Sequence, residues 1–148
     1  MKILVVNDPN LNLLGVREPD LYGRGTYAEL TDFIGRVAAE CGAEVEVRQT
    51  NHEGVIVDWL QECRGAFDAL VLNAAAYTHT SLAIQDAIKA VKVRTVEVHL
   101  TEPKEREAFR RLSFVEPVAE KTCSGRGFES YADAIRHLTG SGRRCCCR

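Results

Sequence analysis

Short apolar segments alternate with amphipathic segments along almost the whole chain, and this alternation is the feature that most restricts its fold. The apolar segments contain few polar residues at alternate positions, as expected of strands that are buried on both faces. Strands of this kind, separated by helices, form a parallel sheet with helices packed on both sides. The alternation therefore predicts an α/β protein.

Turn residues and helix caps set the boundaries of the predicted elements. Predicted strands cover 2–7, 43–49, 67–73, 93–99 and, at the edge of the sheet, 115–122. Predicted helices cover 26–42, 50–65, 80–91, 104–111 and 130–138. Thr26 and Glu29 can form a capping box at the start of the first helix. Thr50 and Glu53 can do so at the start of the second, which Gly65 ends. This succession predicts a flavodoxin-like three-layer sandwich around a five-stranded parallel sheet in the order 2-1-3-4-5.

One stretch, NDPNLNLLGVREPDLYGRGT at residues 7–26, fits neither the period of a helix nor that of a strand. It is rich in asparagine, proline and glycine. A connection of this length without regular structure is uncommon in a compact domain unless it is functional. We therefore expect this loop to contribute to a site.

Two further polar loops are predicted to lie at the same edge of the sheet. NAAAYTHTS (73–81) follows the third strand, and HLTEPKEREAFRR (99–111) follows the fourth. Open α/β sheets bind ligands beyond the carboxyl ends of their strands, near the switch in strand order. Together with the 7–26 loop, these segments predict a binding site for a small polar ligand.

Each of these loops also has a purely structural interpretation. NAAAYTHTS could be a tight strand-to-helix turn, with Thr78 or Thr80 as the N-cap and His79 exposed. Arg106 and Arg110 share one face of the predicted helix, which is usually a solvated basic face. Beside a histidine at a strand end, the same pair could instead bind an anion. Spacing alone leaves these alternatives open.

Composition and motifs exclude several classes of function. A net charge of −2 gives no electrostatic footprint for nucleic acid or an anionic membrane. The sequence has no glycine-rich nucleotide-binding motif, no CxxC and no HExxH, so we expect neither a cofactor nor a metal. MKILVVN predicts a strand rather than a secretory signal, and no apolar run approaches the length of a membrane span. We therefore expect a cytoplasmic protein.

The cysteines predict a reducing compartment rather than a disulfide framework. Cys41, Cys63 and Cys123 lie singly within predicted elements, where cysteine packs as a small apolar residue. The other three cysteines lie in the tail, 141–148, which we expect to be disordered. Residues 1–140 are expected to form a single domain.

Three segments together resemble the type II 3-dehydroquinate dehydratases. The family pattern is NGPNLNLLGxREPxxYG, LNPAAYTHTSxAIxDA and EVHLSNxxxREEFR. This chain has NDPNLNLLGVREPDLYG, LNAAAYTHTSLAIQDA and EVHLTEPKEREAFR in the same order and spacing. The resemblance covers nearly the whole chain except its tail, and three separated motifs are more specific than any one of them.

The resemblance implies a cofactor-free hydro-lyase of the shikimate or quinate pathway. Such an enzyme converts 3-dehydroquinate to 3-dehydroshikimate by trans-elimination of water through an enolate. The resemblance also implies trimers that assemble into dodecamers. The alternatives are a non-catalytic or weakly active homologue that binds a small polyhydroxy carboxylate, and an α/β nucleotide-binding module, which the missing glycine motif disfavours.

The family's catalytic roles map onto four residues of this chain. The resemblance implies that Tyr22 removes the proton beside the ketone and that Arg17 stabilises the phenolate form in which Tyr22 acts as the base. His99 would protonate the departing hydroxyl, and Asn10 would hold the enolate through a bound water. A free tyrosine has a pKa of about 10, which must fall to about 7–8 in a useful base. One guanidinium about 4 Å away supplies roughly 4 kcal/mol at an effective dielectric constant of about 20, so a single arginine is sufficient.

The family's substrate-binding roles map onto seven further residues. The implied contacts are Asn73, His79 and Arg110 for the substrate hydroxyls, the Leu100 and Thr101 amides for its carboxylate, Arg106 for closing the site, and Asp86 for reaching the site of a neighbouring subunit.

Two positions depart from the family pattern in charge. Asp8 stands where the family has glycine, and Glu102 lies in the segment that replaces the usual serine–asparagine sequence. We expect both carboxylates to add negative charge near the anionic substrate and to weaken its binding.

Overall fold

The computed structural model describes residues 1–16 and 18–141, with only the backbone of Pro19 and Tyr22. Five strands form one parallel sheet in the order β2-β1-β3-β4-β5. The strands are β1 (Lys2–Asn7), β2 (Glu44–Gln49), β3 (Ala69–Asn73), β4 (Arg94–Val98) and β5 (Lys121–Cys123). The predicted sheet and its strand order are confirmed.

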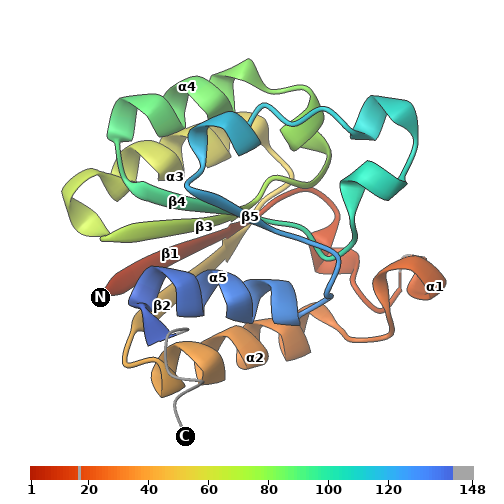
Figure 1. Cartoon of the computed structure of the whole chain (residues 1–148), viewed down its shortest axis with the longest axis horizontal. Helices are drawn as coiled ribbons and strands as arrows, with labels where there is room; N and C mark the ends of the chain where they lie inside the picture. The colour runs from red at the N-terminus through yellow and green to blue at the C-terminus, as the bar shows by residue number, and fades with distance from the viewer. Residues whose placement is uncertain (17, 142–148) are drawn as a thin grey trace, which may run out of the picture.

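Four helices cover the sheet, two on each face. In Figure 1, α2 (Tyr27–Glu40) and α5 (Glu129–Thr139) lie on one face, and α3 (Glu53–Ala66) and α4 (Leu82–Val91) lie on the other. Alternate residues of β1 divide between the two cores. Ile3 and Val5 pack on the side of α2 and α5, whereas Leu4 and Val6 pack on the side of α3 and α4. All four are fully buried, which explains why the sequence of β1 is a continuous apolar run.

The connections between these elements also contain short helical turns. Within residues 7–26, Leu11–Leu13 forms a 3₁₀ helix and Pro19–Tyr22 forms α1. Further 3₁₀ helices cover Ala75–His79, Pro103–Glu105, Ala108–Arg110 and Glu116–Val118.

Two predicted elements are wrong in type or extent. The segment 104–111 is not a helix, because Arg106 and Glu107 have extended backbone conformations that separate two 3₁₀ turns. The edge strand predicted over 115–122 is limited to Lys121–Cys123, and a 3₁₀ turn takes up its first residues.

One predicted capping box is confirmed and the other is wrong. Thr26 and Glu29 cap α2 reciprocally, side chain to backbone in both directions. At α3 the N-cap is His52, and the Thr50 hydroxyl accepts a hydrogen bond from the His52 amide instead. Glu53 is therefore the first helical residue of α3, too close to the helix start to complete a box.

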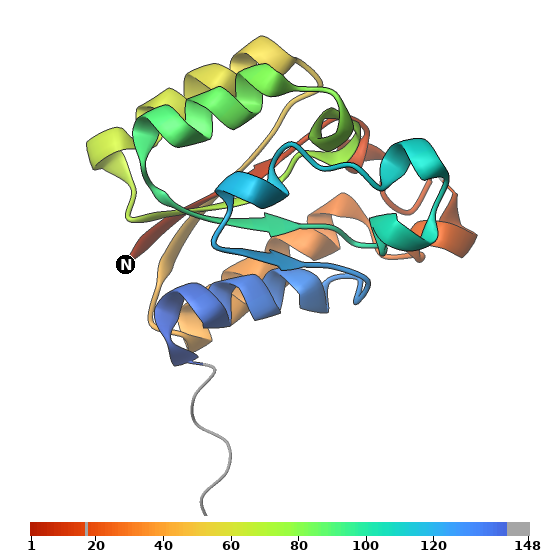
Figure 2. The same cartoon turned by 45° about the horizontal axis from the view of Figure 1, so that its top comes forward.

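The carboxyl ends of the strands point toward one end of the molecule. In both views, α1 (orange) and the 3₁₀ turns that follow β4 (blue-green) lie together at that end (Figures 1 and 2). Within the described residues, none of the helices combines the length and the apolar character needed to cross a membrane.

Candidate active site

The loops that follow β1, β3 and β4 enclose a pocket at the carboxyl ends of these strands. Asn7 and Asn73 pair at the ends of β1 and β3, so the loops after these two strands begin side by side. The pocket contains most of the residues to which the resemblance assigned a role: Asn10, Asn73, His79, His99, Leu100, Thr101, Arg106 and Arg110. Apolar residues of the first loop complete its wall, including Leu11 and Leu14.

Two of the residues that line the pocket have left-handed backbone conformations without being glycine. Asn10 has a φ of 71° and Ala75 a φ of 45°. Such conformations are strained, and they persist where neighbouring contacts over-determine them. The Asn10 amide donates to Asn51 Oδ1 at 3.1 Å, and the Ala75 amide donates to Asn73 Oδ1 at 3.2 Å. These bonds hold both loops against the pocket.

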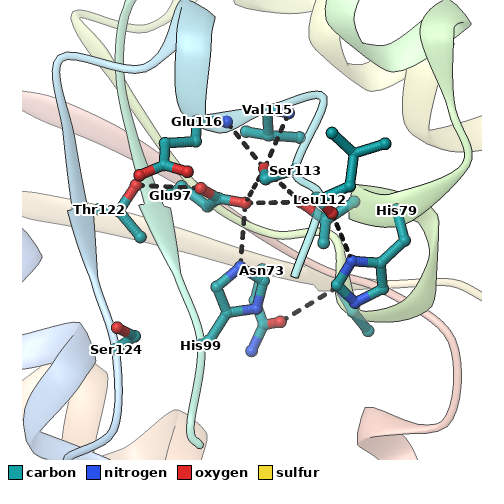
Figure 3. A network of polar contacts seen from close by, with 12 residues as sticks. Asn73, His79, Glu97, His99, Leu112, Ser113, Val115, Glu116, Thr122 and Ser124 are labelled. Carbon is teal, nitrogen blue, oxygen red and sulfur yellow. Dashed lines mark hydrogen bonds and ion pairs between the residues drawn. The ribbon is translucent and has the colours of Figure 1, made fainter. Parts of the chain in front are cut away.

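His99 lies at the end of β4 and pairs with a carboxylate on the same strand. Its Nε2 lies 2.9 Å from Glu97 Oε1, and both side chains are buried. Figure 3 shows Glu97 above the imidazole ring, between Thr122 and Ser113. The contact holds the His99 ring in one orientation at the pocket wall.

The Glu97 carboxylate is held ionised by an unusually complete set of hydrogen bonds. Its Oε1 accepts from Thr78 Oγ1 at 2.5 Å and Ser113 Oγ at 2.8 Å, and its Oε2 accepts from Thr122 Oγ1 at 3.0 Å. Burial by itself raises the pKa of Glu97, but the hydrogen bond and charge of His99, with the hydroxyl bonds, lower it to about 2. An ionised carboxylate only accepts, so His99 Nε2 must carry a hydrogen.

His79 is fixed in the complementary tautomer. Its Nδ1 lies 2.7 Å from the Leu112 carbonyl oxygen, which can only accept, so Nδ1 carries the hydrogen. Burial lowers the pKa of His79, and the nearby charges of His99 and Arg110 lower it further against the opposing effect of the Leu112 bond. The neutral ring therefore keeps Nε2 as a hydrogen-bond acceptor.

Arg106 and Arg110 form a cationic wall even though they do not share a helix face. The Glu107 carboxylate lies 3.6 Å from Arg106 Nε and 3.2 Å from Arg110 Nε. The extended backbone between the two 3₁₀ turns brings both guanidinium groups to this one carboxylate. The two arginines thus lie close together as predicted, but a loop rather than a helix places them there.

Among the described residues, no cluster of three His, Cys, Asp or Glu side chains is arranged as it would be around a metal ion. The polar groups of the pocket include amides, imidazoles, guanidinium groups and the Thr101 hydroxyl, with a buried carboxylate next to one imidazole. Such a set suits proton transfer and the binding of an anionic, hydroxyl-bearing molecule.

Comparison with known proteins identifies the family of this chain. Residues 1–139 match the family described as dehydroquinase class II. The chain belongs to this family. It is 48% identical to "3-dehydroquinate dehydratase 2" of Pseudomonas aeruginosa over 136 residues, which cover 92% of each chain. It is 46% identical to "3-dehydroquinate dehydratase" of Dinoroseobacter shibae, over 95% of this chain and 97% of the relative.

Solved structures of the class II dehydroquinase family have the same fold. The type II dehydroquinase of Butyrivibrio crossotus superposes with a TM-score of 0.91 at 44% sequence identity, covering 93% of this chain and 97% of that one. The fold expected from the resemblance is thereby confirmed.

Two of the residues assigned from the dehydroquinase pattern fall outside the described part of the structure, and a third lies away from the pocket lining. Arg17 and the side chain of Tyr22 lie outside the described residues, as do Cys145, Cys146 and Cys147 of the tail. The Asp86 side chain is on α4, 75% exposed, and lies 3.7 Å from Lys89 Nζ.

Neither residue that departs from the dehydroquinase pattern in charge lines the pocket. The Asp8 side chain is fully buried, and neither of its carboxyl oxygens has a hydrogen-bond partner among the described residues. Burial, and then the charge of Glu53, raises the pKa of Asp8 to about 8. The Glu102 carboxylate accepts from Ser124 Oγ at 2.6 Å and from the Lys104 amide at 3.1 Å. The expectation that Asp8 adds negative charge beside the substrate is therefore wrong. Glu102 lines an adjoining hollow with His79 and His99, so the expectation for Glu102 stays a prediction.

Glu97 is the functional residue that sequence reasoning missed. It lies two residues before His99, so both side chains leave β4 on the same face. A glutamate inside a strand that is otherwise buried needs a partner. The glutamate within the apolar run VRTVEVH therefore indicates a buried carboxylate that is paired with another side chain.

Proposed function

We propose that this chain catalyses the trans-elimination of water from 3-dehydroquinate, giving 3-dehydroshikimate through an enolate and without a cofactor. The observation that carries the proposal is the His99–Glu97 pair in a pocket that also contains Arg106 and Arg110. These groups occupy the positions where the family pattern has its acid and its anion-binding residues. Membership of the dehydroquinase class II family supports the choice of substrate.

His99 serves as the general acid in this reaction. Because Glu97 accepts the hydrogen on Nε2, the proton that His99 gives to the departing hydroxyl leaves from Nδ1. After the transfer, the neutral ring still donates through Nε2 to the carboxylate. Glu97 therefore keeps the ring in one tautomer and one orientation before and after the step.

Tyr22 serves as the base and Arg17 as the group that stabilises its phenolate. Tyr22 removes the proton from the carbon beside the ketone, and the electrons of that C–H bond form the enolate. Asn10 holds the enolate through a bound water. The enolate then reforms the ketone and expels the hydroxyl, which takes the His99 proton and leaves as water.

The remaining pocket residues bind the substrate. His79 Nε2 accepts from a substrate hydroxyl, because Nδ1 already donates to Leu112. Asn73 and Arg110 contact the hydroxyls, the Leu100 and Thr101 amides hold the carboxylate, and Arg106 closes the site.

The proposed assembly is a dodecamer built from trimers, in which Asp86 reaches a neighbouring subunit. Large exposed apolar side chains support it, since Leu82 is 56%, Phe109 69% and Leu112 57% exposed. Light scattering coupled to size-exclusion chromatography measures the assembly: a dodecameric mass is expected, and a monomer would contradict the proposal. The enzyme would act in the shikimate or quinate pathway in the cytoplasm.

A non-catalytic homologue that binds a polyhydroxy carboxylate is not favoured. That alternative rested on Asp8 and Glu102 placing charge against the substrate. Asp8 is buried outside the pocket, and Glu102 is held by Ser124 and Lys104.

Ultraviolet absorbance of the conjugated enone product tests the proposed function. Purified protein should convert 3-dehydroquinate with a steady rise in absorbance, and His99→Gln should lower kcat by about 10²–10⁴-fold. The matched control is His137→Gln, since His137 also lies 2.9 Å from a glutamate, Glu120, but on the surface. The control should retain kcat. A folded wild-type protein that binds 3-dehydroquinate without any rise in absorbance would contradict the proposal.

A further inference from the structure

A chain of polar side chains runs through the buried layer directly below Asn73. Asn73 Nδ2 donates to Tyr131 Oη at 2.7 Å, and Tyr131 Oη donates to Asn7 Oδ1 at 2.7 Å. Asn7 Nδ2 in turn donates to Tyr27 Oη at a longer 3.4 Å. The chain therefore connects α5 and α2 to the pocket ends of β1 and β3.

The direction of each hydrogen bond in this chain is determined by its chemistry. A tyrosine hydroxyl has one hydrogen, and the Asn7 carbonyl oxygen can only accept, so the Tyr131 hydrogen points to Asn7. Tyr131 Oη must then accept from Asn73, which requires the nitrogen of the Asn73 amide to face Tyr131. The oxygen of the same amide faces the Ala75 backbone, from which it accepts at 3.2 Å.

This arrangement decides what Asn73 can offer to a ligand. A carboxamide has two N–H donors, and Tyr131 takes one of them. The other N–H belongs to a side chain that lines the pocket. If the amide were flipped, its oxygen would meet the Tyr131 oxygen and its nitrogen would meet the Ala75 N–H. The Ala75 amide and the Tyr131 hydroxyl therefore together hold the Asn73 amide in one of its two orientations.

Burial makes the loss of any of these hydrogen bonds costly. Asn7 and Tyr131 are fully buried and Asn73 is 3% exposed, so water cannot easily replace a lost partner. Burial also raises the pKa of Tyr131, and the hydroxyl keeps the hydrogen on which the direction of the chain depends.

We propose that Tyr131 is a positioning residue for substrate binding: its hydroxyl holds the Asn73 amide with an N–H directed at a substrate hydroxyl. This inference rests on the proposed function, in which Asn73 contacts the substrate. Tyr131 lies in the core between the sheet and α5, away from the pocket lining, and acts only through Asn73.

Tyr131→Phe tests the proposal because it removes the hydroxyl and keeps the ring. KM for 3-dehydroquinate should rise about three- to tenfold, whereas kcat should change by less than about twofold. Tyr27→Phe removes a hydroxyl at the far end of the same chain and should leave KM within about twofold of wild type. Ile135→Val shortens a fully buried side chain on the same helix, and should lower stability without changing KM.

A double-mutant cycle separates positioning from a general structural effect. In an Asn73→Ala background, Tyr131→Phe should leave KM unchanged to within about twofold, because the group that Tyr131 orients is absent. If Tyr131→Phe does not fold, Asn7→Ala removes the acceptor that directs the Tyr131 hydrogen, and it should raise KM in the same way.

The outcomes distinguish this inference from the proposed function. An unchanged KM in folded Tyr131→Phe, beside a raised KM in Asn73→Ala, would overturn the inference and leave the function intact. An equal rise of KM in Ile135→Val would overturn it as well. A wild-type protein that does not convert 3-dehydroquinate would overturn the function first.

Discussion

Two buried carboxyl groups near the carboxyl ends of the strands have opposite environments. Glu97 on β4 and Asp8 just after β1 are both fully buried. Glu97 accepts hydrogen bonds from three hydroxyls and from His99, and its pKa is lowered to about 2. Asp8 has no hydrogen-bond partner for its carboxyl oxygens among the described residues, and its pKa is raised to about 8.

The difference shows that hydrogen-bond donors, rather than depth of burial, decide which carboxyl carries charge. Burial disfavours the charged form in both cases. At neutral pH Glu97 is ionised and accepts the hydrogen on His99 Nε2, whereas Asp8 is mostly neutral. Of these two carboxyl groups, the one that carries charge is thus the one that pairs with His99.

The largest expected effect follows from neutralising Glu97. Glu97→Gln keeps the size of the side chain but removes the charge that accepts the hydrogen on His99 Nε2. We expect kcat to fall by about 10²–10³-fold in the enone assay, with a smaller change in KM. Glu120→Gln is the matched control, because Glu120 forms a 2.9 Å contact to His137 on the surface. A variant with near-full kcat would show that the pair has no role in turnover.

A large effect on stability is expected from removing the Asp8 carboxyl. The pKa of Asp8 is higher in the folded state, at about 8, than its ordinary value of 3.8, so the unfolded chain loses this proton at lower pH than the folded chain. The contribution of Asp8 to stability is therefore greatest below pH 3.8, falls as the pH rises, and levels off above about pH 8. Asp8→Ala should raise the free energy of unfolding by roughly 2–4 kcal/mol at neutral pH.

Urea unfolding at several pH values measures this effect. The stability difference between Asp8→Ala and wild type should be small near pH 4 and large near pH 8, whereas Asp32→Ala on the exposed face of α2 should show little such trend. KM should stay within about twofold of wild type, because Asp8 does not line the pocket. A wild-type protein that gains stability over Asp8→Ala as the pH rises would contradict the assigned environment.

The smallest effect is expected from removing one donor to Glu97. Thr122→Val deletes the hydroxyl that bonds Oε2 at 3.0 Å and leaves the three contacts to Oε1. Stability should fall by about 1–2 kcal/mol and kcat by less than about threefold. Thr139→Val removes a hydroxyl that donates to Ile135 within α5 and should cost about 0.5 kcal/mol or less. Equal losses of stability in Thr122→Val and Thr139→Val would contradict a particular stabilising role for the hydrogen bond between Thr122 and Glu97.

The sheet order was predictable from the sequence because the apolar runs and the helices between them agree with the same fold. Thr26 and Glu29 are three residues apart before an apolar stripe, and they cap α2 as that spacing predicts. Thr50 and Glu53 have the same spacing, yet Thr50 binds the His52 amide and the helix begins later. A local motif of this kind is ambiguous when tertiary contacts choose the start of the helix.

The site was predictable only in part, because sequence spacing does not give the direction of a side chain in an irregular segment. The Arg106 and Arg110 guanidinium groups come together through Glu107 and an extended backbone, not through a helix face. Asp8 continues the alternation of Leu4 and Val6, which points it into the core beside α3. The inward direction of the Asp8 side chain could therefore be predicted from the sequence. Its lack of a hydrogen-bond partner could not, because that depends on neighbours from other segments.

Direct titration of the two carboxyl groups tests the central contrast most simply. In protein labelled with ¹³C at its side-chain carboxyl carbons, Asp8→Ala and Glu97→Gln assign the two signals by their disappearance. We expect the Asp8 signal to titrate with a midpoint near pH 8, and the Glu97 signal to remain that of a carboxylate at every pH well above 2. If both signals titrated near pH 4, as exposed carboxyl groups do, the contrast between Asp8 and Glu97 would be contradicted.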